Sequence, residues 1–277
     1  MRFNLWRRAR SVENEYLKSL YILCNIFRKI AESSGNDQQK YIQRMNNFQN
    51  SYQYEKFIMS TVKRMVTPLS VDNMRTWRQA ARKSTKGKFL YRVLMEELDQ
   101  GIGQVINNQV ISNASLIRTL PNDVAQKVTK NIAEEALKGE RARSIEQIIR
   151  QETDKHSRAS ARLIARTEVS KTQSALTQAR SEQLDLRWYV WRTALDGDRV
   201  RKSHRLMEGV LVNWKDPPAP EELAGEKSAG HYHAGNIYNC RCYPEPLLDI
   251  DDVKWPHKVY QNGQIISMGK RQFEQIM

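Results

Sequence analysis

The chain has 277 residues, of which 40% are hydrophobic and 27% are charged, and its formal net charge at pH 7 is +14. This length allows one large domain or two modest ones, and no apolar run approaches the roughly 20 residues of a membrane span. Three cysteines are too few for a disulfide framework, and no apolar segment with a cleavage site follows the basic N-terminus. We therefore expect a soluble, non-secreted protein in a reducing compartment.

The first two thirds of the chain are expected to be helical. Apolar residues recur at spacings of three and four from Val12 to Ile30 and from Tyr41 to Tyr52, which indicates two amphipathic helices. The small polar residues 33–36 separate them. Prolines, glycines and capping residues predict the later boundaries: Pro68, Asp72, Gly87, Pro121, Gly139 and Ser144, with a last long helix over residues 157–183.

The C-terminal third has the composition of short strands. Aromatic and β-branched residues predict strands at 188–191, 210–212 and 240–243, and Asn262-Gly263 is typical of a β-hairpin turn. A Pro-rich and charged stretch over 217–230 indicates a long loop. The predicted fold class is mainly α, with a helical N-terminal body and a small C-terminal α+β module of short strands.

Positive charge is concentrated in the first half, where residues 1–150 carry 26 Lys and Arg against 14 Asp and Glu. Seven cations occur in succession with no acidic residue between them: Arg75, Arg78, Arg82, Lys83, Lys86, Lys88 and Arg92. Spacings of three and four place Arg75, Arg78, Arg82 and Lys86 on one helix face, which could follow a phosphate backbone.

The function of this basic run is open between three interpretations. Contact with double-stranded DNA or with an acidic protein surface would use its charge, and an ordinary solvated helix face would not. Three aromatic residues lie among the cations, and they either stack on bases or face the core: Trp77, Phe89 and Tyr91.

Four of the histidines and cysteines in the C-terminal third are candidate ligands of one zinc ion: His204, His233, Cys240 and Cys242. Residues two apart on a strand point to the same face, so both cysteines could reach one ion, with the two histidines completing a tetrahedral site. Such a site has no open position and would be structural. The alternative is a pair of small buried thiols with surface histidines.

The same residues are weak candidates for catalysis. A Cys and His pair is the minimum for a thiol nucleophile, and a metal-dependent nuclease or toxin-like effector is the alternative function. The adjacent Asp-His pair of a ββα-metal nuclease is missing, as are a Gly-rich phosphate loop and a Ser-centred nucleophile motif. We therefore expect a protein that is not an enzyme.

An ordered series of short motifs identifies a family resemblance. The series comprises Arg166-Thr167-Glu168, Trp191, Asp198-Arg199, Gly209 and Asn239-Cys240-Arg241-Cys242. It resembles the head-morphogenesis domain of the Mu F-like minor head protein family of tailed bacteriophages, over about residues 111–248. Residues 1–110 are then a basic helical region for partner or DNA contact, and residues 249–277 a tail with a hairpin.

This resemblance implies a virion component of the head interior near the portal, made in the cytoplasm of the bacterial host. The implied partners are the portal protein, a scaffold or major capsid protein and double-stranded DNA, in procapsid assembly and in DNA packaging or ejection. Many relatives have a Cys-x-x-Cys pair where this chain has Arg201 and His204. A metal site here has therefore lost one ligand or uses His231.

Overall fold

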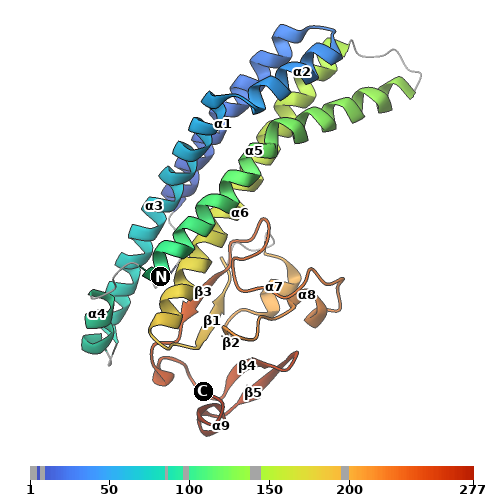
Figure 1. Ribbon diagram of the computed structural model, residues 1–277. Coiled ribbons are helices and arrows are strands. Elements are labelled where there is room, and N and C mark those ends of the chain that lie inside the picture. Colours follow the sequence, from blue (N-terminus) through green and yellow to red (C-terminus); the bar gives the residue numbers. More distant parts are fainter. Residues whose placement is uncertain (1–4, 7–9, 85–86, 96–99, 138–144, 195–199) are drawn as a thin grey trace. The chain divides into compact units, whose positions relative to one another are not determined.

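The structure is a computed structural model that describes residues 5–6, 10–84, 87–95, 100–137, 145–194 and 200–277 (Figure 1). The fold is 67% helical, with a helical N-terminal body and a small C-terminal sheet, which confirms the predicted fold class. The chain forms two compact units. The helical unit comprises residues 10–67 and 108–165, and the sheet unit comprises residues 1–9, 68–107 and 166–277.

The helical unit is built from α1 (Arg10–Ser34), α2 (Gln38–Gln49) and parts of three longer helices: α3 (Tyr52–Lys83), α5 (Gln100–Leu137) and α6 (Ile145–Gln183). The predicted stripe of α1 is buried, with Leu20, Leu23 and Phe27 fully enclosed. Two tyrosine hydroxyls form hydrogen bonds inside this unit. The hydroxyl of Tyr41 contacts that of Thr153 at 2.8 Å, and the hydroxyl of Tyr54 donates to a backbone carbonyl of α5.

Two helix boundaries expected at prolines are wrong. Helix α3 continues through Pro68 and α5 continues through Pro121. A proline inside a helix removes one backbone hydrogen bond and costs about 3 kcal/mol. Both helices bury apolar side chains on each side of the proline, for example Leu120 and Val124 around Pro121, and this burial offsets the cost. Helix α6 is also continuous from Ile145 to Gln183, whereas the sequence predicted a short helix after Ser144 and a separate one over residues 157–183.

The sheet unit contains one five-stranded sheet with the order β3-β1-β2-β4-β5. Its strands are β1 (Trp188–Arg192), β2 (Leu211–Asn213), β3 (Tyr243–Pro246), β4 (His257–Gln261) and β5 (Gln264–Met268). Neighbouring strands are antiparallel except for β2 and β4, which are parallel with Leu211 opposite Val259. Short helices accompany them: α4 (Gly87–Met95), α7 (Lys202–Leu206), α8 (Pro220–Leu223), η2 (Ile250–Asp252) and α9 (Lys270–Glu274).

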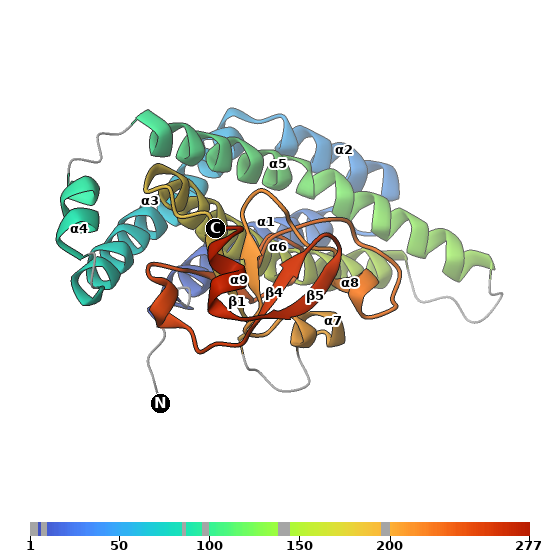
Figure 2. The same cartoon turned by 90° about the horizontal axis from the view of Figure 1, so that it is seen from below.

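The C-terminal segment is part of this sheet (Figure 2). Asn262 and Gly263 have φ angles of 51° and 79°, as a type I′ turn requires, and they join β4 to β5 in the predicted hairpin. Because β4 pairs with β2, residues 249–277 complete the sheet, where the sequence had suggested a separate tail. The boundaries expected at 110 and 248 do not coincide with those of the compact units.

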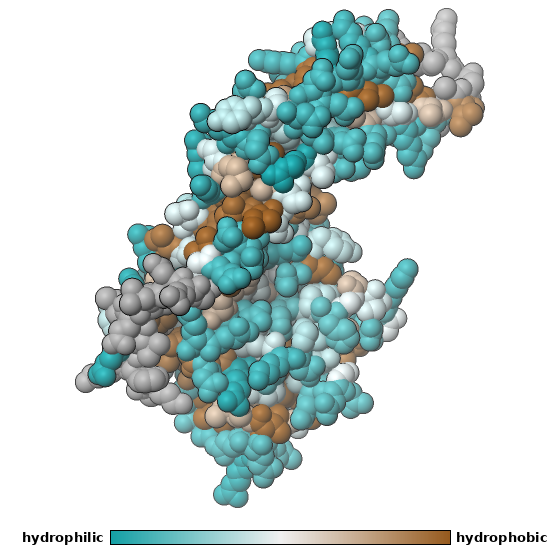
Figure 3. Space-filling model, viewed as in Figure 1, coloured by the Kyte–Doolittle hydropathy of each residue, from teal (hydrophilic) through white to brown (hydrophobic). Residues whose placement is uncertain are grey.

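The two faces of β1 bury different residues. Trp191 and Tyr189 lie in one apolar core, whereas Trp188 and Val190 lie in another with Phe273 of α9. Trp188 and Trp191 are three residues apart on one strand, so they face opposite sides of the sheet. Hydrophilic residues cover most of the face in Figure 3, with hydrophobic residues dispersed among them. Within the described ranges, no helix is both long and apolar enough to cross a membrane.

Candidate functional site

The predicted basic run lies on two helices of the sheet unit. Helix α3 carries Arg75, Arg78, Arg82 and Lys83, and α4 carries Lys88 and Arg92, whereas Lys86 lies outside the described residues. The helix ends at Lys83, so the structure confines the shared face to the cations of α3. Among these, Arg75, Arg82 and Lys83 are exposed and Arg78 is half-buried.

Two aromatic residues of this region, Trp77 and Tyr91, take part in packing. Trp77 is 1% exposed and packs against Trp6 and residues of α4, so it faces the core and is not available to stack on bases. The Arg82 guanidinium donates to the Tyr91 hydroxyl at 3.1 Å and lies 5.1 Å from the centre of that ring. This contact joins the end of α3 to α4 and keeps one cation of the run at the surface.

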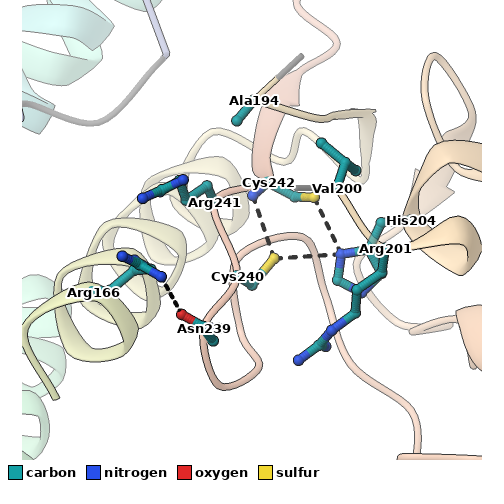
Figure 4. Close-up of a pocket in the computed structure, with 9 residues that line it drawn as sticks. All are labelled: Arg166, Ala194, Val200, Arg201, His204, Asn239, Cys240, Arg241 and Cys242. Carbon is teal, nitrogen blue, oxygen red and sulfur yellow. Dashed lines mark hydrogen bonds between the residues drawn. The ribbon is translucent and has the colours of Figure 1, made fainter. Parts of the chain in front are cut away.

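The structure brings together three of the four predicted zinc ligands. Nδ1 of His204 lies 3.6 Å from Cys240 Sγ and 3.4 Å from Cys242 Sγ, and all three side chains are buried (Figure 4). Zinc at about 2.3 Å from sulfur and about 2.0–2.1 Å from nitrogen, at a tetrahedral angle, separates the two atoms by about 3.5 Å. The spacing and chemistry of these three groups therefore fit zinc.

The two cysteines lie in a loop, because the strand predicted for residues 240–243 begins only at Tyr243. Asn239 has a φ of 57°, and the Cys242 backbone N–H donates to Cys240 Sγ at 3.3 Å, so the backbone folds back on itself. An extended strand would hold alternate residues about 6.5 Å apart. The turn explains why both sulfurs reach the same imidazole.

Helix α6 holds this loop through small hydroxyl side chains. Ser170 donates to the Cys240 carbonyl at 2.9 Å, and Ser174 donates to the Ala234 carbonyl at 2.8 Å. Gly235, with a φ of 84°, passes so close that an added Cβ would lie 2.8 Å from the Cys242 carbonyl oxygen. Small residues on both sides allow this close contact.

Two residues that the sequence analysis did not single out orient the imidazole. The Tyr232 hydroxyl donates its one proton to the Glu221 carboxylate at 2.7 Å and accepts from Nε2 of His204 at 2.9 Å. With the proton of a neutral imidazole on Nε2, Nδ1 directs its lone pair at the two sulfurs, as a metal ligand must. No sequence signal pointed to this pair, because neither Glu221, in the short helix α8, nor Tyr232, in the loop after it, belongs to a motif.

The two thiols have opposite pKa shifts. The hydrogen bond from Cys242 lowers the pKa of Cys240 well below the usual thiol value, although burial opposes this. The same hydrogen bond, together with burial, raises the pKa of Cys242 well above that value. The pair therefore favours one thiolate, the form of cysteine that binds metals.

His233, the fourth predicted ligand, lies outside this group. Its Nδ1 is 3.2 Å from the Tyr189 hydroxyl, and its ring packs against Trp214 with the centres 5.0 Å apart. Burial lowers the pKa of His233 to about 4, so the imidazole is neutral. His231 is exposed and contacts the Pro217 carbonyl, so it does not supply the missing ligand either.

The motif residues join α6 to the cysteine loop. Nη1 of Arg166 donates to the Asn239 side chain, and the Asn239 backbone N–H donates to the Thr167 hydroxyl at 2.9 Å. Glu168 is buried beside Lys171, and burial raises the pKa of its carboxyl group. The Gly209 N–H donates to the Trp191 carbonyl at 2.9 Å. Asp198 and Arg199 lie outside the described residues.

A cavity of about 370 Å³ opens beside the cysteines and His204 (Figure 4). Arginines line it from three places: Arg166 of α6, Arg201 before α7 and Arg241 of the cysteine loop. Arg201 donates to the Tyr238 carbonyl at 2.9 Å. Five residues of the motif series thus line one cavity: Arg166, Asn239, Cys240, Arg241 and Cys242.

Residues 123–244 match the sequence model of a family described as Phage Mu protein F like protein. A protein of Haemophilus influenzae Rd, described as an uncharacterized protein, is 29% identical to this chain over 171 residues. That similarity covers 62% of this chain and 34% of the relative, so the chain spans about a third of the relative's length. No solved structure matches the chain. Residues 123–244 are therefore similar to the Phage Mu protein F like family.

Proposed function

We propose that this chain is a minor head protein of a tailed phage or prophage, bound near the portal and acting in procapsid assembly and in DNA packaging or ejection. The observation that carries the proposal is the family match over residues 123–244. The motif residues of that match support it, because they form one connected structure on α6 and the cysteine loop. Its place in the virion is the head interior, where packaged DNA is the surrounding polyanion.

The proposed DNA contact is the exposed basic face of α3 and α4, defined by Arg75, Arg82, Lys83 and Arg92. These side chains are exposed cations on a chain with a net charge of +14. Cations on a helix face bind phosphates without reading the bases, so the affinity should be independent of sequence and should fall steeply with salt.

The test uses the full-length protein and linear duplex DNA in a salt series, with and without zinc or magnesium. The double variant R75Q/K83Q removes two exposed cations of the basic face, and K63Q/R64Q removes two exposed cations elsewhere on the same helix. Each phosphate contact contributes about 0.9 to the slope of log K against log salt. We expect R75Q/K83Q to reduce that slope by about 2, and K63Q/R64Q to leave it unchanged.

Each result has a definite meaning. An equal loss in both variants, or no binding by the wild type, would contradict DNA contact through this face and favour an assembly role with acidic proteins. Metal-dependent cleavage of the DNA would instead support the nuclease alternative. Cross-linking within purified procapsids would test the proposed portal neighbour, and recovery of scaffold or major capsid protein alone would contradict it.

We further propose that His204, Cys240 and Cys242 hold a zinc ion that stabilises the cysteine loop. The carrying observation is the pair of 3.4 and 3.6 Å separations between Nδ1 of the histidine and the two sulfurs. The described residues provide three ligands, so water or a further group would complete the tetrahedron. Bound zinc would join the loop to α7, and part of its binding energy would appear as folding stability.

Zinc content of the purified protein tests this ligand set. We expect about one zinc per wild-type chain, and loss of the metal in C240S and H204A. H233Q and C24S are the matched controls, because His233 lies outside the group and Cys24 is buried in the helical unit. Equal zinc content in all five proteins, or loss in H233Q alone, would show that the ligand set is wrong.

A further inference from the structure

A groove on the helical unit lies between two of its long helices. Its volume is about 420 Å³, and every residue that lines it belongs to the helical unit. Helix α5 lines one side from Leu116 to Lys130, and one turn of α6 around Leu163 lines the other. Neither the zinc site nor the basic face of α3 and α4 includes this α5–α6 groove.

Three leucines make part of the groove apolar. Leu120 is buried within it, whereas Leu116 and Leu163 are 42% and 45% exposed. Single exposed leucines are common on protein surfaces, but leucines that gather at one hollow mark a contact site for another protein, because enclosing them removes apolar surface from water.

Charges of both signs lie along the same wall of the groove. Asp123 and Lys130 follow Leu116 at intervals of seven residues. Seven residues are almost two helical turns, so these three side chains share one face of α5. Lys127, one turn after Asp123, lines the groove as well.

The contacts of these charges within the chain are weak. Asp123 accepts from the neutral Thr119 hydroxyl at 3.1 Å. Lys130 lies 3.7 Å from Glu134 on the same helix, and the two side chains are 75% and 51% exposed. An ion pair this exposed contributes little to stability, so Lys130 can exchange it for another partner.

The mixture of charges indicates which partner fits the groove. A uniformly acidic surface would repel Asp123, and a uniformly basic one would repel the two lysines. A second copy related by a two-fold axis presents the same groove in the reverse direction. Asp123 of each copy then meets lysines of the other, and the contact forms twice. The exposed leucines of both copies are enclosed in the same contact.

We propose that the α5–α6 groove is the interface of an antiparallel homodimer, in which Asp123 of one copy pairs with Lys127 and Lys130 of the other. The inference goes beyond the head-protein role, which assigns this groove no partner. The net charge of +14 opposes association at long range, so the dimer should form best at moderate salt, where that repulsion is screened.

Sedimentation equilibrium of the full-length protein, free of DNA and at moderate salt, measures the dimer over a concentration series. D123K leaves only cations among the described charged residues of the groove, and K127E/K130E leaves only anions. We expect each variant alone to be monomeric where the wild type is dimeric, and an equimolar mixture of the two to form a heterodimer. The mixture restores opposite charges across the contact, and a folding defect would not be rescued in this way.

A second pair of variants tests the apolar part of the contact. L116E should weaken the dimer about 100-fold or more, because each dimer loses two enclosed leucines. I111E is the matched control, since Ile111 is 60% exposed on the same helix and is absent from the described lining of the groove.

Each result is decisive, and none depends on DNA binding. A wild type that stays monomeric at its highest soluble concentration would overturn the proposal and leave the groove to a different protein. A dimer that persists in both D123K and K127E/K130E, or equal effects of L116E and I111E, would place the contact elsewhere. Failure of the mixed variants to associate, when circular dichroism shows both to be folded, would contradict the reciprocal pairing.

Discussion

Acidification should destabilise the sheet unit through His233. Its imidazole is buried against Tyr189 and Trp214, and burial lowers its pKa to about 4 from the ordinary value of 6.5. Between these two values the unfolded chain binds a proton that the folded protein does not. Stability is therefore lost as the pH falls through this window, by about 2 kcal/mol at pH 5 and by about 3 kcal/mol at the acid limit.

Urea denaturation of the wild type and H233Q at pH 7 and pH 5 isolates this contribution, because the other titrating groups are common to both proteins. The wild type should lose about 2 kcal/mol more than the variant between the two pH values. A chelator should leave this difference unchanged, since His233 lies apart from His204 and the cysteines. Equal losses in the two proteins would refute the assignment of His233 as a buried neutral residue.

Two substitutions test the packing of the sheet unit. Phe273→Ala removes a fully buried ring that packs against Trp188, and it should lower the free energy of unfolding by about 3–5 kcal/mol in urea denaturation; an unchanged midpoint would mean that residues 249–277 are a detached tail. Gly235→Ala should destabilise the protein more than Gly263→Ala, because both glycines have a positive φ but only at Gly235 would the new Cβ meet the Cys242 carbonyl. Equal midpoints for the two glycine variants would contradict that close contact.

Local signals predicted those parts of the fold that local chemistry determines. A type I′ hairpin turn requires two successive positive φ angles, and the pair Asn262-Gly263 adopts them, so the hairpin was predictable. The apolar stripe of α1 was predictable for the same reason. Pro68 and Pro121 were misleading, because a proline reports only a local cost. Whether a helix continues through it depends on side chains such as Val124 that pack from elsewhere in the fold.

The candidate zinc site was predictable in its residue types but not in its geometry. Cys240 and Cys242 were expected to share the face of a strand, whereas they lie in a turn that brings both sulfurs to His204. His233 has the same side chain as His204 and lies near the cysteines in the sequence, but it packs in the aromatic core. Only the path of the chain distinguishes a ligand from a core histidine.

The contacts of the cysteine loop show that motifs about 70 residues apart in the sequence meet in the fold. Arg166 and Thr167 bind the two sides of Asn239, and Ser170 binds the Cys240 carbonyl, with sequence separations of 73, 72 and 70 residues. These residues lie within about one turn of α6, so one short stretch of helix fixes the whole loop. The motifs are thus the two halves of a single contact surface, and the sulfurs of Cys240 and Cys242 are placed by α6 as much as by their own loop.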